Sequence, residues 1–308
     1  MRRFQKMLVS VDVQAGQQPA LKRAVELATH NQAELTLVAL LEPLPWHLRD
    51  GIPREIEAER LEDCQSGLEK LATPIRTQGL TVDTKILREN GDVELIHEVL
   101  RGRHELVMKV ASGKVSRRDM FHSTLDQRLL RKCPCPVWLF PPTTSSRFER
   151  ILAAVDATPD DVGHGQLNRT VLELASSLQT SEDAELHIVH AWDIPDEGRL
   201  LARLGDEAFL SLVNSSQASI DQELNRLLAR HAVAAVPERI HLMKGAPHAV
   251  IFETVDRQQI DLLVMGSIAR TGIPGMFIGN TAERVLNAVG CSVLTVKPSD
   301  FVSPVALT

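Results

Sequence analysis

The feature that most constrains the fold of this chain is an internal repeat about half the chain long. The run MLVSVD at residues 7–12 returns as ILAAVD at residues 151–156. The run ELTLV at residues 34–38 returns as ELHIV at residues 185–189, and later apolar runs match in the same order. A repeat this long indicates two related domains rather than a solenoid, whose units recur every ~20–50 residues. The two halves can therefore be compared position by position.

Composition narrows the class of protein. A chain of 308 residues accommodates two domains of ordinary size, each able to bury a core. The chain contains no apolar run of the roughly 18 residues that a membrane span needs. The net charge of -6 argues against general binding to nucleic acid or to an anionic membrane. Four cysteines and an N-terminus without a secretory apolar segment lead us to expect a cytoplasmic protein.

Each half alternates strand-like and helix-like patterns. We expect strands near residues 6–12, 34–41, 82–88, 105–110 and 135–140, and again near 150–156, 185–191, 239–243, 261–266 and 291–297. These runs are continuously apolar, as in a parallel sheet that helices cover on both faces. The fold class predicted is α/β, with two tandem doubly wound domains of five strands each.

The boundary between the halves coincides with a cluster of Pro, Thr and Ser at residues 141–146. Such a cluster is typical of a linker. We therefore predict a first domain at residues 1–141, a linker at 142–148, a second domain at 149–300 and a tail at 301–308.

Candidate site residues lie at the carboxyl ends of the predicted strands, where open α/β sheets bind ligands. Asp12 and Asp156 end the first strand of each half. In the second half, Gly266 opens a glycine-rich loop that leads to a predicted helix start at Asn280 or Thr281. Glycines allow the backbone to approach an anion, and the N–H groups of a helix start favour phosphate. The alternative is that the glycines only punctuate a long loop.

This loop has neither of the two common phosphate-binding patterns, but its spacing resembles that of the universal stress protein family. The family spacing Gly-x2-Gly-x9-Gly-Ser/Thr is occupied by Gly266, Ala269, Gly279 and Asn280. Both halves open with an apolar run followed by Val-Asp, and the family ending Cys-Pro-Val-Leu-Val-Val appears as CPVWLF and CSVLTV, from Cys135 and Cys291.

The resemblance covers nearly the whole chain, in the tandem form of the family. It implies a five-stranded parallel sheet flanked by helices in each half, like that of the adenine nucleotide alpha hydrolases. It also implies that residues 291–298 support contacts between domains or between chains. Nucleotide-binding members hold ATP, with Mg²⁺, or another adenine nucleotide at this loop.

The resemblance assigns a role to each matching position of the second half. Asp156 would hold the ribose, and the backbone at His190 and Ala191 would read the adenine edge. The triphosphate would be lined by Gly266, Ala269, Gly279 and Asn280, with Thr281 as a substitute hydroxyl.

Two departures from the family pattern keep other functions open. Ala269 adds a methyl group where the family has its second glycine, and Asn280 replaces a hydroxyl with an amide. One alternative is a binder of a different small or amphiphilic metabolite, and another is a ligand-free interaction scaffold with vestigial sites. In every case we expect a regulatory protein rather than an enzyme, with at most slow incidental ATP hydrolysis. The sequence contains no Gly-x-Ser-x-Gly elbow, paired catalytic carboxylates or zinc-spaced ligands.

The first half departs further from the pattern. Val110 stands where Gly266 stands, and Ser123 stands where Gly279 stands, so we expect its nucleotide motif to be degenerate. This half instead carries a basic cluster: Lys109, Lys114, Arg117, Arg118, Arg128, Arg131 and Lys132. The cluster is interpreted either as a solvated helix face or, over residues 114–132, as a site for an acidic protein partner or for an anion held in a different way.

Three further features have structural interpretations. Cys133 and Cys135, separated by one Pro, are read as a turn into a buried strand rather than a metal or redox pair. The apolar positions between 200 and 213 are read as core or as the face of a homodimer of tandem chains. His164 follows Asp156 in a long loop and is read as solvated or as a ligand contact.

Overall fold

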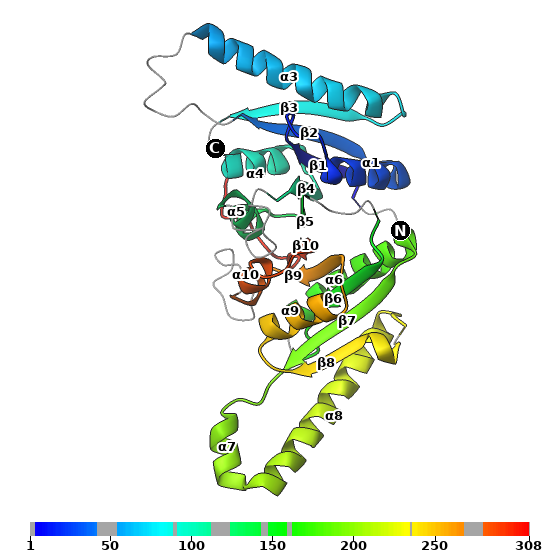
Figure 1. Ribbon diagram of the computed structural model, residues 1–308, viewed down its shortest axis with the longest axis vertical. Helices are drawn as coiled ribbons and strands as arrows, with labels where there is room; N and C mark the ends of the chain where they lie inside the picture. Colours follow the sequence, from blue (N-terminus) through cyan, green and yellow to red (C-terminus); the bar gives the residue numbers. More distant parts are fainter. Residues whose placement is uncertain are drawn as a thin grey trace.

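The computed structural model describes residues 4–41, 54–88, 91–111, 124–142, 147–158, 162–234, 236–267 and 280–307. The described strands form a single ten-stranded sheet that runs through the whole molecule (Figure 1). Its strand order is β3-β2-β1-β4-β5-β10-β9-β6-β7-β8. The tandem α/β fold is thereby confirmed, and the two five-stranded units are joined edge to edge.

The two halves share one order of elements, except that two helices and a 3-10 turn in the second stand where the first has α3. The first consists of β1 (Lys6–Val11), α1 (Pro19–Asn31), β2 (Glu34–Leu41), α3 (Arg54–Arg76), β3 (Val82–Arg88), α4 (Gly91–Gly102), β4 (Leu106–Val110), α5 (Thr124–Lys132) and β5 (Val137–Phe140). The second consists of β6 (Arg150–Ala154), α6 (Val162–Glu182), β7 (Glu185–Trp192), α7 (Glu197–Leu204), α8 (Asp206–Arg230), a 3-10 turn (Pro237–Arg239), β8 (Ile240–Lys244), α9 (Pro247–Arg257), β9 (Leu262–Gly266), α10 (Asn280–Leu286) and β10 (Ser292–Val296). Each predicted strand is present, with its ends within about two residues of those expected.

The continuous apolar runs form strands that are buried on both faces. In β1, Met7 and Val9 pack into a core with α1, α3 and α6, while Leu8 packs into the opposite core with α4 and α5. All three side chains have no exposed surface. Successive side chains of a strand point to opposite faces, so a strand covered by helices on both sides needs apolar residues throughout.

The strand order places a topological switch point in each half. In the first half β1 lies between β2 and β4, and in the second β6 lies between β7 and β9. The chain continues from each central strand to the neighbour on one side, β2 or β7, and later crosses back to the neighbour on the other side, β4 or β9. Ligands of open α/β sheets bind at such switch points.

The two halves meet where β5 and β10 pair antiparallel, with Trp138 opposite Leu294. This pairing confirms the expected contact through the end of the second domain. Each half covers an edge strand that would otherwise expose unpaired backbone groups.

The C-terminal tail lies back on the first half, near α4 (Figure 1). Ser303 Oγ donates a hydrogen bond of 2.7 Å to the Lys132 carbonyl, and His97 Nε2 donates one of 3.0 Å to the Ala306 carbonyl. Val305 packs against the hydrophobic cluster that includes residues of α4 and α5. The tail therefore links the end of the second domain to the first.

The helical hairpin of α7 and α8 extends away from the body of the second half (Figure 1). The expectation of a buried core here holds for Phe209, which is 9% exposed, but not for Leu204, which is 45% exposed. Among the described helices, none combines the length and the hydropathy of a membrane span.

Candidate functional site: a cavity at the carboxyl ends of β6, β7 and β9

A cavity of about 840 Å³ opens at the switch point of the second half. Pockets for small molecules measure roughly 300–1,000 Å³. The cavity brings together five of the residues predicted from the sequence: Asp156, His190, Ala191, Gly266 and Thr281. They come from the ends of three strands and the start of α10, so this convergence depends on the tertiary fold.

The other predicted positions cannot be placed in the same way. Ala269 and Gly279 lie outside the described residues. Asn280 is the first residue of α10, and its side chain also lies outside the described part. Their assignment to the phosphate end of a nucleotide therefore stays a prediction.

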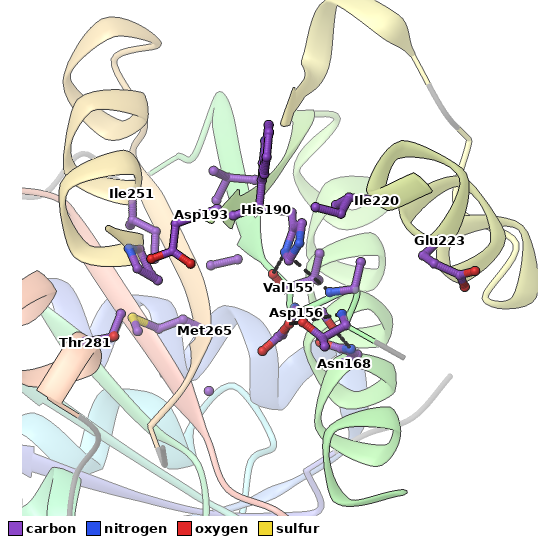
Figure 2. A pocket seen from close by; sticks show the side chains of 18 of the residues that line it. Val155, Asp156, Asn168, His190, Asp193, Ile220, Glu223, Ile251, Met265 and Thr281 are labelled. Carbon is purple, nitrogen blue, oxygen red and sulfur yellow. Dashed lines mark hydrogen bonds between the residues drawn. The ribbon is translucent and has the colours of Figure 1, made fainter. Parts of the chain in front are cut away.

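Asp156 is held by its neighbours at the end of β6 (Figure 2). Thr158 donates to the Asp156 carboxylate from its amide (3.1 Å) and from its hydroxyl (2.7 Å). Asn168 of α6 brackets the backbone, since its Oδ1 accepts from the Asp156 amide at 3.0 Å and its Nδ2 donates to the Asp156 carbonyl at 2.6 Å. These contacts of Thr158 and Asn168 hold Asp156 at the cavity wall. Sequence reasoning did not find Asn168, which lies twelve residues away on the next helix.

His190 contributes its side chain to the site as well as its backbone. The ring is 4% exposed, and Nδ1 lies 3.1 Å from the Val155 carbonyl and 3.4 Å from the Ala157 amide. The first contact is a hydrogen bond donated by Nδ1 in one tautomer, and the second is one accepted in the other. In either form the ring connects the end of β7 to the loop after β6.

The remaining walls combine apolar and acidic side chains that the sequence did not single out. Ile220 and Glu223 line the cavity from α8, Ile251 lines it from α9, and Asp193 lines it from just after β7 (Figure 2). Trp192, the last residue of β7, lines it as well. An apolar slot with polar groups at its edges suits a ligand with a flat ring and a polar or charged end.

Two glycines shape this cavity. A Cβ on Gly266 would lie 2.5 Å from Leu167 Cδ2, so the end of β9 packs closely against α6. Gly245 has a φ of +149°, which disfavours other residues, and its amide donates to the Trp192 carbonyl at 2.8 Å. Gly266 was predicted for its approach to phosphate, and the structure adds a packing reason for it.

Comparison with known proteins identifies the relatives of this chain. The model of the universal stress protein family matches residues 3–141 and again residues 147–297. The chain belongs to this family. It is 29% identical to universal stress protein E of Escherichia coli K12 and 27% identical to that of Photorhabdus laumondii, in each case over at least 98% of both chains. Its fold is similar to that of a putative universal stress protein from Pseudomonas aeruginosa, with a TM-score of 0.77 at 24% identity over 97% of this chain and 95% of that one.

The first universal stress domain fills the space that the second leaves open. Lys109 and Asp126 form a buried ion pair, with Nζ 2.9 Å from Oδ1 and the two residues 5% and 0% exposed. Aligned by the repeat, these positions correspond to Met265 and Ala282, which line the cavity of the second domain. Charged partners thus occupy the corresponding place in the first domain.

A second contact closes the same end of the first domain. A Cβ on Gly67 of α3 would lie 2.8 Å from Val13 Cβ, so α3 lies directly against the residue after Asp12. The corresponding residue of the second domain is Ala157, which lines the cavity. Val13 carries two more methyl groups than Ala157 and packs against α3, so it fills space that Ala157 leaves open.

The described part of the basic cluster is paired inside the molecule. Arg128 and Lys132 lie 3.2 and 3.5 Å from the Asp92 carboxylate, and Arg131 lies 2.8 Å from Glu283 of the other domain. Lys109 pairs with Asp126, as above. Lys114, Arg117 and Arg118 lie outside the described residues. A protein partner for residues 114–132 stays a prediction. Arg128, Arg131 and Lys132 already have acidic partners, so they attract an acidic protein less strongly than unpaired side chains would.

The cysteines are buried inside the protein and none forms a disulfide. All four cysteines are free and buried, and Cys133 Sγ lies 3.6 Å from Cys135 Sγ. Burial raises the pKa of Cys291 to about 12. Within the described residues, no group of three or more His, Cys, Asp or Glu side chains could hold a metal ion. The side chain of His164 lies outside the described part.

Proposed function

We propose that the second universal stress domain binds an adenine nucleotide in its cavity and that binding regulates the protein. The observation that carries this proposal is the convergence of Asp156, His190, Ala191, Gly266 and Thr281 on one cavity of nucleotide size. The family has a role in the stress response, and its members are generally regulatory rather than catalytic. We therefore propose that this chain acts by binding and not by turnover.

Each residue has a chemical task in this proposal. The Asp156 carboxylate accepts hydrogen bonds from ribose hydroxyls, as acidic side chains at the end of such strands do in dinucleotide sites. The backbone at Ala191 faces the adenine edge, between the apolar side chains of Ile220 and Ile251. Thr281 offers a hydroxyl to the phosphates. Where the nucleotide is ATP, Mg²⁺ would take its ligands mainly from phosphate oxygens and water, as is usual for this ion.

The test is a calorimetric titration of the full chain with ATP and ADP, after removal of any co-purified ligand. We expect Asp156→Ala to weaken binding at least tenfold, because hydrogen bonds donated to a charged acceptor are worth about 1.5–3 kcal/mol each. The repeat provides a matched control in Asp12→Ala, which removes the corresponding acid of the filled domain and should leave binding unchanged. Equal losses in both variants, or no binding to the parent chain, would contradict the proposal.

One observation favours a different ligand class. A second hollow of about 500 Å³ between α7 and α8 shares Asp193, Pro195, Ser219 and Ile220 with the cavity. It is lined further by Ile194, Leu200 and Leu212. An amphiphilic metabolite could place its polar part in the cavity and its apolar part in this hollow. Mass spectrometry of the molecules released when the freshly purified protein is denatured distinguishes the two ligand classes. The nucleotide hypothesis predicts an adenine compound, and the amphiphile hypothesis predicts a molecule with an apolar chain.

A third possibility is a scaffold without a ligand. It predicts that no small molecule is released and that excess Mg-ATP produces no binding heat, together with a stable stoichiometric protein partner. The same two experiments therefore distinguish all three functions.

A further inference from the structure

A separate cleft of about 480 Å³ crosses the seam between the two domains. It lies between α1 of the first domain and α6 of the second, and it includes Trp138 and Leu294, which pair across β5 and β10. We call it the seam cleft. It shares no lining residue with the nucleotide cavity, and its volume falls in the usual range for small-molecule sites.

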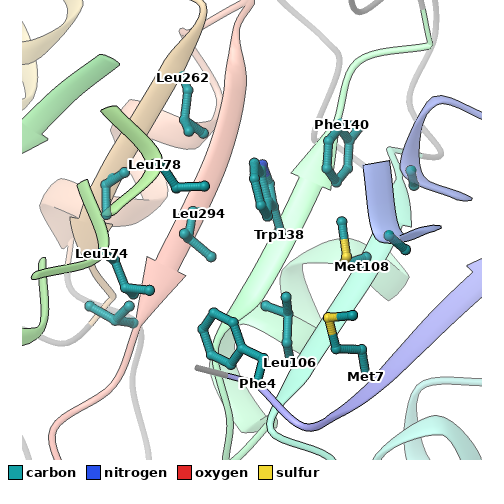
Figure 3. Packing of buried hydrophobic residues seen from close by; sticks show 14 of the residues in the cluster. Phe4, Met7, Leu106, Met108, Trp138, Phe140, Leu174, Leu178, Leu262 and Leu294 are labelled. Carbon is teal, nitrogen blue, oxygen red and sulfur yellow. The ribbon is translucent and has the colours of Figure 1, made fainter. Parts of the chain in front are cut away.

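The apolar wall of the seam cleft is built by both domains. Phe4 and Trp138 of the first domain lie opposite Leu174, Leu178 and Leu294 of the second (Figure 3). Trp138 is 1% exposed and stacks on Phe148 and Phe140. A flat or aliphatic group would be enclosed here by side chains that come from two domains.

Two buried hydrogen-bond donors belong to residues that line the cleft. Arg23 Cζ lies 5.7 Å from the centre of the Trp138 ring. Arg23 Nε and Trp138 Nε1 are both buried, and neither has an acceptor among the residues that the structure describes. Buried N–H groups are nearly always paired, with protein, with ordered water or with a ligand. Two such donors on adjacent side chains indicate an acceptor that the described residues do not supply.

The charged side chains of the cleft already have partners inside the protein. The Arg23 guanidinium lies 3.1 Å from the Glu26 carboxylate and pairs across the seam with Glu182. Arg147 donates two hydrogen bonds to the Glu182 carbonyl, at 3.1 and 2.9 Å, and lies 3.8 Å from Asp183. An anion or a cation would have to displace one of these partners. An uncharged ligand leaves them in place.

We propose that the seam cleft is a second binding site, for a small uncharged molecule with a flat ring and a carbonyl-type oxygen. The oxygen accepts the hydrogen bonds that Arg23 Nε and Trp138 Nε1 donate, and the ring packs against Leu174, Leu178 and Leu294. Because the ligand touches both domains, its binding stabilises their arrangement across β5 and β10. The site exists only where α1 and α6 meet, and so belongs to the tandem chain rather than to either domain.

The test uses benzamide, a neutral aromatic amide, as the probe on the ¹⁵N-labelled full chain. The indole N–H signals of Trp46, Trp138 and Trp192 are assigned from single Trp→Phe variants. We expect the Trp138 signal to shift saturably, with a dissociation constant on the order of a millimolar for so small a ligand. The Trp192 signal, which reports on the nucleotide cavity, should stay in place.

Two variants on α6 provide a matched pair. Ser177 is exposed and lines the cleft, so Ser177→Trp should fill the site and abolish the shift of Trp138. Thr180 is exposed on the same helix but does not line the cleft, so Thr180→Trp should leave the benzamide titration unchanged. Both variants should bind ADP as the parent chain does, which separates this site from the nucleotide cavity.

Three outcomes would overturn the proposal. The first is a Trp138 signal that does not move up to the solubility limit of benzamide, as when ordered water alone satisfies the donors. The second is a shift that ADP competes away, which would place benzamide in the adenine site. The third is an equal shift in the Ser177→Trp variant.

Discussion

The buried ion pair of the first domain leads to the sharpest prediction, because the second domain supplies its natural replacement. Lys109 Nζ and Asp126 Oδ1 are 2.9 Å apart, which corresponds to an attraction of about 6 kcal/mol at an effective dielectric constant of 20. Burial of the two charges offsets most of that attraction. Lys109 Nζ also donates to the Val110 carbonyl at 2.7 Å, so the ammonium is well held.

We predict that removing either partner alone destabilises the protein by about 3–5 kcal/mol, since the other charge then stays buried and unpaired. Asp126→Ala and Lys109→Met are the two single changes. The double variant carries the residues found at these positions in the second domain, Met265 and Ala282. It should lie within about 2 kcal/mol of the parent chain, because exchange of a buried pair for apolar residues is often close to neutral.

The assay is urea unfolding of the four chains, analysed as a double-mutant cycle. The cycle should return a coupling of at least about 3 kcal/mol in favour of the pair. Additive losses, or single variants that lose less than about 1 kcal/mol, would refute the argument that a buried pair occupies this space.

Three further predictions follow from the same structure. Ala157→Val introduces the residue that the first domain has at this position, Val13. It should weaken ADP binding at least tenfold in calorimetry, with little change in stability. Undiminished binding would contradict the inference that Val13 fills this space in the first domain. His187 Nδ1 lies 3.0 Å from His241 Nε2, and burial lowers the pKa of both imidazoles. The two rings therefore stay neutral in the folded protein, whereas in the unfolded chain they take up protons below pH ~6.5. The free energy of unfolding should therefore fall as the pH drops from 7.5 to 5.5, and His241→Gln should reduce that loss in urea titrations. An equal loss in the variant and the parent chain would refute this prediction. Deletion of residues 301–308 removes the hydrogen bonds to α4 and α5 and should cost about 1–2 kcal/mol, visible as a lower urea midpoint, whereas an unaltered midpoint would show the tail to be unneeded.

Much of the architecture was determined by the sequence alone. The repeat of apolar runs predicted two related α/β halves, and their continuous hydrophobicity predicted parallel strands covered on both faces. Strand ends at Asp156 and Gly266 pointed to the edge of the sheet where the cavity lies, because the carboxyl ends of parallel strands meet there. These inferences succeed because strand and helix periods are local properties of the chain.

The tertiary structure decided which residues meet. Asn168 clamps Asp156, Ile220 and Glu223 close the cavity from a projecting hairpin, and Lys109 and Asp126 fill the corresponding space in the first domain. None of these partnerships has a spacing that a period of 2 or 3.6 residues would reveal. They depend on where helices settle against the sheet and on which volumes side chains leave empty, and those are properties of packing between segments distant in sequence.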